Sequence, residues 1–237
     1  MNSAISLAVG LGFVLGLKHA LDADHLIAVS TIVSEHKTIW RSALVGVLWG
    51  IGHTLSLLVV GVFVLVLRLS ISPRMALSME FSVALMLILL GANVLWKYRR
   101  GEHLHVHSHG QNSPLHLHFH SHVDASESSR SHHSVRMPKR PLWVGMVHGL
   151  AGSAALTLLV LTTLPTALSG LIYILVFGLG SIGGMLLMST AISLPFVLTA
   201  QRFDRFNHHI RFAAGTLSAL FGGFLAYQIA FVERLFR

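Results

Sequence analysis

Apolar runs long enough to cross a lipid bilayer dominate this sequence. Of its 237 residues, 53% are hydrophobic and 11% are charged, whereas a soluble domain carries about 25% charged residues. A helix needs about 20 consecutive apolar residues to cross a bilayer. We therefore predict an all-α integral membrane protein with about six transmembrane helices, at roughly 4–33, 43–67, 75–96, 142–164, 168–198 and 212–232.

Basic residues concentrate in alternate connections between these runs. The formal net charge is +8, but Lys and Arg favour the first, third and fifth connections by twelve to four. Connections rich in Lys and Arg stay on the cytoplasmic side. We therefore expect a multi-pass protein of the cell membrane with both termini outside, in contact with membrane lipid and not with nucleic acid. We also expect the run from Ala4 to be a retained helix and not a signal peptide, because no basic region precedes it.

One stretch inside the first run, LKHALDADHLIAV at 17–29, carries most of the ionisable groups found at bilayer depth. Such groups cost a few kcal/mol each and usually mark an ion path or a substrate site. Imidazole together with carboxylate suits Ni²⁺, Co²⁺, Zn²⁺ or Mn²⁺. Cysteine is absent, so thiolate ligands and disulfides are excluded. The run is longer than one span, so its helix is expected to tilt, to extend beyond the bilayer or to break near its charges.

We predict a metal site built from histidine and aspartate side chains of this stretch and of two later runs. His53 lies in WGIGHT, and His148 lies in GMVHGL. The predicted ligands are His19, Asp22, Asp24, His25, His53 and His148.

Three alternatives remain open at this point. Asp and His side chains could form a proton relay. Lys18 and Asp22, at i and i+4, could form a structural ion pair with the histidines packed nearby. His53 and His148 could be ordinary core histidines. Glu80, near one end of its run, is expected to reach the lipid headgroups.

A polar, histidine-rich segment separates the first three runs from the last three. It contains HLHVHSH and HLHFHSH and holds ten of the seventeen histidines. Histidines at every second position could line one face of a hairpin. The preferred prediction is a flexible cytoplasmic loop that binds divalent metal loosely, in a storage or regulatory role.

The two halves of the chain resemble each other weakly. GLKHALDADHLIAV from Gly16 resembles GMVHGLAGSAALTL from Gly145, and WGIGH from Trp49 resembles FGLGS from Phe177, at offsets of 129 and 128 residues. Three spans per half is an odd number, so the two copies would have opposite orientations, as in many carriers. We predict a first three-helix repeat at 1–98, the His-rich loop at 99–140 and a second, inverted three-helix repeat at 141–237.

The motif from His19 to His25 resembles the HxxxxDH signature of the nickel/cobalt transporter family, and WGIGHT resembles that family's element in the next span. The short layout is similar to the urease-accessory-type permeases of this superfamily. The resemblance implies secondary uptake of Ni²⁺ or Co²⁺, with His19, Asp24 and His25 at the signature positions. Longer members carry a further span before the signature and an acidic element in the second half, where this chain has FGLGSIGGM. Related exporters lack the Asp-Ala-Asp-His ending, which favours uptake.

We therefore predict a secondary transporter and not an enzyme, with Ni²⁺ or Co²⁺ as transported substrate, no cofactor, and alternating access at a His/Asp site. Export of the same ions and an intramembrane metalloenzyme are the alternatives. The sequence leaves open whether the chain forms a homo-oligomer or works with metal-delivery proteins for nickel enzymes.

Overall fold

The computed structural model describes residues 3–36, 38–66, 71–100, 104–107, 116–119, 139–151, 166–200 and 204–236. The regular secondary structure of these residues is helical except for one pair of short strands. The helices are α1 (Ser3–His19), α2 (Ala23–Val33), α3 (Ile39–Val66), α4 (Pro73–Arg99), α5 (Lys139–Leu150), α7 (Ala167–Ala200) and α8 (Asp204–Tyr227), which continues as a π-helix (Gln228–Val232).

Four of these helices are long and apolar enough to cross a membrane: α3, α4, α7 and α8 with its π-helical extension. They correspond to the second, third, fifth and sixth predicted runs. A capping residue fixes the beginning of α4, where the Ser72 side chain accepts a hydrogen bond from the Met75 amide at 3.3 Å and Pro73 takes the first helical position. The prediction of a helical membrane protein is thus confirmed in its coarse form.

The first predicted run is not one helix. α1 ends at His19, a short turn follows, and α2 begins at Ala23, so the chain breaks at its charges, which is one of the three outcomes considered above. In the fourth predicted run, α5 ends at Leu150, and residues 152–165 lie outside the described part of the chain. The predicted number of six spans is therefore not tested.

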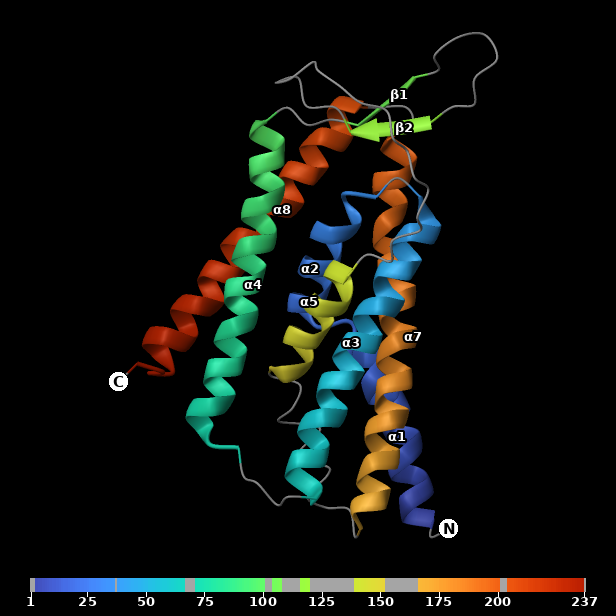
Figure 1. The fold of residues 1–237 in the computed structure, drawn as a ribbon, viewed down its shortest axis with the longest axis vertical. Coiled ribbons are helices and arrows are strands. Elements are labelled where there is room, and N and C mark those ends of the chain that lie inside the picture. Colours follow the sequence, from blue (N-terminus) through green and yellow to red (C-terminus); the bar gives the residue numbers. More distant parts are fainter. Residues whose placement is uncertain are drawn as a thin grey trace.

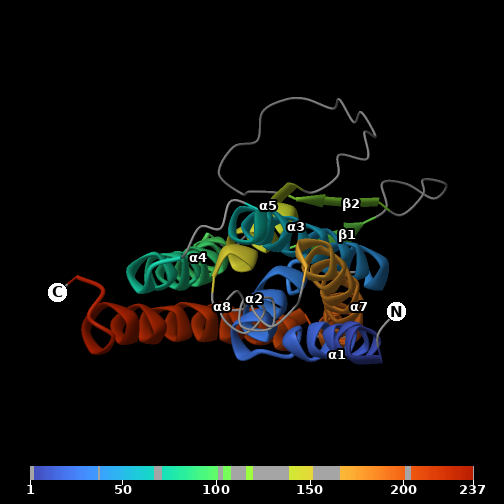
Figure 2. The ribbon, with the colours of Figure 1, turned by 90° about the horizontal axis from the view of Figure 1, so that it is seen from below.

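The two short helices α2 and α5 lie in the middle of the molecule (Figure 1). The long helices pack around them in pairs. α4 lies beside α8 on one side, and α7 lies between α3 and α1 on the other, as the view from below also shows (Figure 2). Within each pair the chain directions are opposite, since α3 descends where α7 ascends, and α4 ascends where α8 descends (Figure 1).

Glycine allows the helices to approach backbone to backbone at two points next to the centre of the molecule. A Cβ on Gly16 of α1 would collide with the carbonyl oxygen of Phe177 in α7, and a Cβ on Gly145 of α5 would collide with the carbonyl oxygen of Trp49 in α3. Small residues that permit such approach are typical of membrane helix interfaces. These contacts hold the half-length helices α1 and α5 against the long ones.

Two short stretches of the His-rich segment form paired strands, whereas the preferred prediction was a flexible loop. Strands β1 (Leu104–His107) and β2 (His116–Phe119) are antiparallel, with His105 opposite His118 and His107 opposite His116. An alternating sequence has the period of an extended strand, which explains why these eight residues pair. The pair lies at the end of the molecule remote from the N-terminus (Figure 1).

Candidate metal centre

The break between α1 and α2 positions the candidate metal-binding side chains. The amides of Leu21 and Asp22 bond to the carbonyls of Lys18 and His19 at 2.9 and 3.1 Å, which closes a tight turn. Asp22 then takes an extended backbone at the N-cap of α2, but its side chain caps nothing. Its Oδ2 instead lies 2.6 Å from Nδ1 of His19. The turn thereby directs the following Asp24 and His25 into the centre of the molecule.

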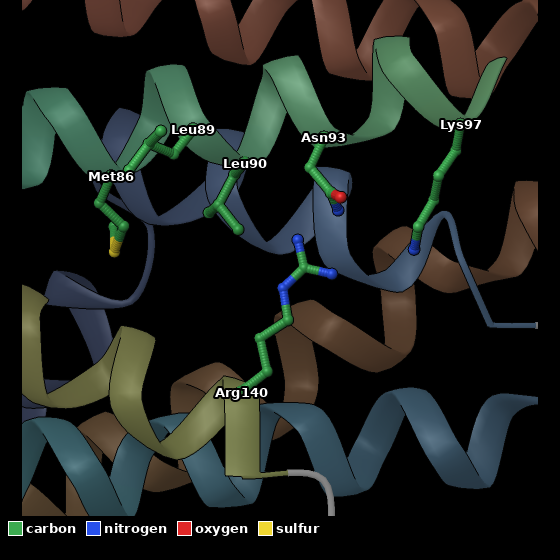
Figure 3. Close-up of a pocket in the computed structure, with 6 residues that line it drawn as sticks. All are labelled: Met86, Leu89, Leu90, Asn93, Lys97 and Arg140. Carbon is green, nitrogen blue, oxygen red and sulfur yellow. The ribbon is translucent and has the colours of Figure 1, made fainter. Parts of the chain in front are cut away.

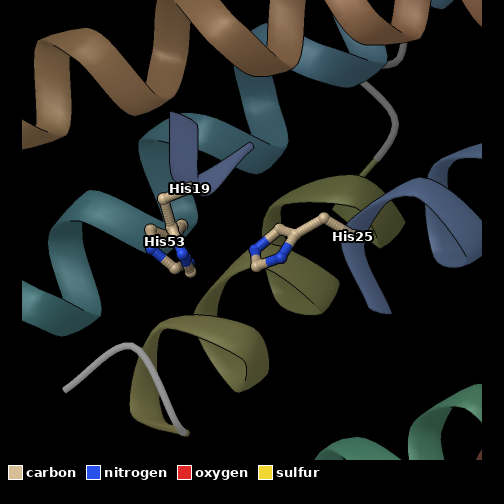
Figure 4. A group of neighbouring side chains, drawn as sticks. All are labelled: His19, His25 and His53. Carbon is tan, nitrogen blue, oxygen red and sulfur yellow. The ribbon is translucent and has the colours of Figure 1, made fainter. Parts of the chain in front are cut away.

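Three histidines form the first donor group (Figure 4). His19 ends α1, His25 lies in the first turn of α2, and His53 lies in the middle of α3. Their ring centroids are 4.5 Å apart for His19 and His25, 5.0 Å for His19 and His53, and 5.5 Å for His25 and His53. Each can present one nitrogen such that the three lie within 4.8 Å of one another.

A second donor group shares His25 with the first and adds a carboxylate. Asp24 lies between two imidazoles, with Oδ1 3.2 Å from Nδ1 of His25 and Oδ2 3.3 Å from Nε2 of His148. His148 comes from α5, in the second half of the chain. Donor atoms of these three residues again lie within 4.8 Å of one another.

Several buried ring nitrogens of these groups lack hydrogen-bond partners. Nε2 of His19, Nε2 of His25 and both ring nitrogens of His53 are buried without one, and His53 is 0% exposed. A buried polar atom without a partner costs about 1–3 kcal/mol. A metal ion would satisfy several of these nitrogens at once.

Two of the three helix ends around the groups favour a positive ion, and the positive dipole end of α2 is offset by Asp24 in its first turn. α1 ends at His19 and α5 ends two residues after His148, so both helices point the negative ends of their dipoles at the site. Asp24 contributes a full negative charge in the first turn of α2. Helix C-terminal ends and a carboxylate stabilise a cation, whereas an anion would be repelled by both.

The donor atoms are close enough for one ion to bind with little rearrangement. Metal–nitrogen bonds of about 2.1 Å place two ligands on one ion at most about 4.2 Å apart. Within each group all donor atoms lie within 4.8 Å of one another, so the side chains would have to close by at most several tenths of an ångström. Small rotamer shifts are enough for this.

The structure brings five of the six predicted ligands into these groups: His19, Asp24, His25, His53 and His148. Asp22, the sixth, contacts His19 from outside, with its side chain 52% exposed. The alternative of a Lys18–Asp22 ion pair finds no support, because Asp22 pairs with His19 and Lys18 is exposed. Glu80, expected among the headgroups, lines a cavity together with Asp24.

Two aromatic residues beside the site were not predicted. The Trp49 ring is 0% exposed and lies 5.2 Å from that of His148 and 5.9 Å from that of His25. The Phe177 ring lies 5.7 Å from that of His19. They are the first residues of WGIGH and FGLGS, so the repeat contained a signal for both, although periodicity alone marks them only as core residues.

Long apolar helices around a buried group of histidines and a carboxylate define a class, the polytopic membrane proteins that handle a metal cation. The chain belongs to the high-affinity nickel-transport protein family (NicO), whose model matches residues 5–219. The urease accessory protein UreH of Bacillus sp. (strain TB-90) is 40% identical over 237 residues, which cover 96% of this chain and 93% of that protein. No solved structure matches the chain.

The resemblance inferred from the HxxxxDH motif is therefore confirmed. The family is one of nickel transporters and not of enzymes, and nickel is a transported substrate and not a cofactor. Membership of this family, together with the four apolar helices, makes this a membrane protein.

Proposed function

We propose that this protein takes up Ni²⁺ across the cytoplasmic membrane by alternating access at the two donor groups. The observation that carries the proposal is the convergence of buried, unpartnered imidazole nitrogens with the Asp24 carboxylate. Imidazole and carboxylate are suited to Ni²⁺ and equally to Co²⁺, so cobalt is a second candidate substrate.

The shared ligand suggests how the ion moves through the site. His25 belongs to both groups, with Asp24 and His148 on one side and His19 and His53 on the other. A cation held first by the group with the carboxylate can pass to the three histidines while keeping its bond to His25. Stepwise exchange avoids releasing an ion that has lost most of its water in a low-dielectric interior.

We further propose that the two halves form inverted repeats that rock about this site. Contacts between the halves recur in reciprocal form at the offsets of 128 and 129 residues. Gly16 meets Phe177 as Gly145 meets Trp49, and ring contacts pair His19 with Phe177 as they pair His148 with Trp49. Exchanging the two halves converts each contact into its counterpart, which supports a two-fold relation.

Further glycine contacts along the helices also occur as reciprocal pairs at the offsets of 128 and 129 residues. The reciprocal pairs are Gly52 with Leu142 and Gly180 with Phe13; Gly50 with Ile182 and Gly178 with Thr54; Gly46 with Ser189 and Gly61 with Ile174; and Gly215 with Val94 and Gly222 with Leu87. Similarity between apolar sequences can arise by chance, but reciprocal contacts between packed helices do not follow from composition. In a transporter, such repeats place the substrate where they meet.

An ion-pair cluster at one end of the molecule is suited to close the path. Glu35, after α2, accepts hydrogen bonds from Nζ of Lys97 in α4 at 3.0 Å and from Nη1 of Arg140 in α5 at 3.1 Å. Lys97 and Arg140 both extend into the cavity that they line (Figure 3). The cluster ties the two halves together. We assign this end, which also carries β1 and β2, to the cytoplasm from the excess of basic residues.

Uptake and export are distinguished by transport assays in intact cells. Uptake predicts that expression raises the cellular content of radioactive nickel and that Asp24→Asn and His25→Ala abolish the increase. Export predicts lower metal content and resistance to nickel, and that result would overturn the proposal. Competition with unlabelled cobalt tests the second substrate. Flux into proteoliposomes that contain only the purified protein tests whether a delivery protein is required.

A further inference from the structure

A cavity between α2, α4, α5 and α8 joins Asp24 to two further carboxylates. It has a volume of about 310 Å³. Its polar lining consists of Asp24, Glu80, Gln228 and Glu233, and the remaining lining is mostly apolar, from residues such as Val83, Phe221 and Leu225. Among the described residues it therefore has negative charges and no positive ones.

The three carboxylates of this cavity come from different elements. Glu233 is exposed just after the π-helix and accepts a hydrogen bond from Nε2 of Gln228 at 3.3 Å. Glu80 is half-buried and lies seven residues into α4, which is about 10 Å along the helix axis. Asp24 is the carboxylate of the donor group itself.

Through Asp24 the cavity adjoins a buried histidine of the second donor group. His148, 2% exposed, directs Nε2 to within 3.3 Å of Oδ2 of Asp24, and its other ring nitrogen has no hydrogen-bond partner. A carboxylate that lines the cavity is thus in direct contact with a buried imidazole whose hydrogen-bonding capacity is unused. An acidic surface patch alone would not provide such a connection.

The cavity at the opposite end of the molecule has the opposite charge. It has a volume of about 400 Å³ and is lined by Lys97, Arg140, Asn93 and three apolar side chains. Its two cations are held by Glu35. A divalent cation would be repelled there and attracted to the acidic cavity.

We propose that the acidic cavity is the external vestibule for the hydrated divalent cation, and that Glu233 and Glu80 capture the ion and deliver it to Asp24. This rests on the proposed uptake function. Two carboxylates in a cavity with apolar walls concentrate a 2+ ion, because the low-dielectric walls focus the field. Glu80 then determines the apparent affinity for the divalent cation. The ion, and not the lipid headgroups, explains why a carboxylate lies in this apolar helix.

The first test measures the concentration dependence of nickel uptake in cells that express Glu80→Gln, Glu233→Gln or the double variant. Each is expected to raise the apparent KM, with the double variant reaching about tenfold, and the increase should shrink at high ionic strength because salt screens exposed charges. Glu80→Asp, which keeps the charge, should retain a KM close to that of the original protein. An unchanged KM in both Gln variants would overturn the proposal.

The second test uses the absence of cysteine from the chain. Leu225 lines the cavity, so Leu225→Cys places a thiol in it. Its neighbour Phe224 is 59% exposed on the outer face of α8, so Phe224→Cys places a thiol at the same depth but outside the cavity. A membrane-impermeant cationic thiol reagent added outside intact cells should label Leu225→Cys and not Phe224→Cys, because only a hydrated thiol forms the reactive thiolate. Added Ni²⁺ should slow the labelling. Labelling of Leu225→Cys only in inside-out vesicles would overturn the proposal.

Asp24→Asn separates this proposal from the function on which it rests. If Asp24→Asn abolishes uptake while the Glu80 and Glu233 variants keep the original KM, the vestibule is wrong and the transport site stands. If Asp24→Asn transports normally, the proposed function itself is wrong.

Discussion

Oδ2 of Asp24, in the first half of the chain, lies 3.3 Å from Nε2 of His148, in the second half. The carboxylate also contacts His25 at 3.2 Å, so it bridges imidazoles from two separate helices. Neither half alone contains this donor group. A cation bound here would hold the halves together at their interface, which is where a carrier with two moving halves needs its substrate.

Asp24 and His148 are expected to act as a unit in metal binding. Asp24→Asn and His148→Gln should each weaken binding of Ni²⁺ by about 10-fold to 100-fold, since each removes an interaction with a charged group. The double variant should lose less than the product of the single effects, because both residues serve one ion. Calorimetric titration of the purified protein in detergent measures this, and strictly multiplicative losses would contradict a shared ion.

Asp22 is expected to act through His19. Its Oδ2 is 2.6 Å from Nδ1 of His19, which favours the tautomer with the proton on Nδ1 and leaves Nε2 free to bind metal. Asp22→Ala should weaken nickel binding by about tenfold, and Asp22→Asn, which can still accept the hydrogen bond, should weaken it less. Lys18→Gln is the matched control, because Lys18 is exposed and should tolerate the change. Equal losses for the Ala and Asn variants would show that Asp22 contributes charge and not orientation.

Gly222 and Gly223 provide a paired test of helix packing. A Cβ on Gly222 would lie 2.8 Å from the carbonyl oxygen of Ala84 in α4, whereas a Cβ on Gly223 would meet nothing within 4 Å. Gly222→Ala should force α4 and α8 apart and destabilise the protein by about 1–3 kcal/mol. Gly223→Ala should be neutral or stabilising by up to about 1 kcal/mol, because Ala favours helix. The midpoint of thermal unfolding in detergent measures both, and equal midpoints would contradict this packing.

Glu35 is expected to keep the cytoplasmic end closed. Glu35→Gln leaves Lys97 and Arg140 without their counter-charge, and each partly exposed ion pair contributes up to about 1 kcal/mol. The equilibrium should shift towards the state that is open to the cytoplasm. In the Glu35→Gln background, labelling of Leu225→Cys from outside should slow, and labelling of Asn93→Cys in inside-out vesicles should accelerate. No change at either position would show that the cluster serves stability alone.

The sequence predicted the helical membrane class and named the five side chains that the structure brings together in the two donor groups. Both inferences depend on properties that are local along the chain. An apolar run of bilayer length forms a helix because its backbone must hydrogen-bond internally in lipid, and an ionisable group within such a run is rare enough to mark function. The preference for a flexible His-rich loop was wrong for the strand residues, because loop composition does not exclude local pairing.

The tertiary structure alone decided which donors meet. His25 and His148 lie 123 residues apart in the sequence, yet their ring centroids are 4.5 Å apart. It also placed the break after His19, the contacts of Trp49 and Phe177 with the imidazoles, and Glu80 in the cavity with Asp24. The physical reason is that these distances depend on how closely helices pack, and packing is set by glycine contacts between residues that are remote in the chain. Hydropathy and spacing describe one helix at a time and contain no information about that approach.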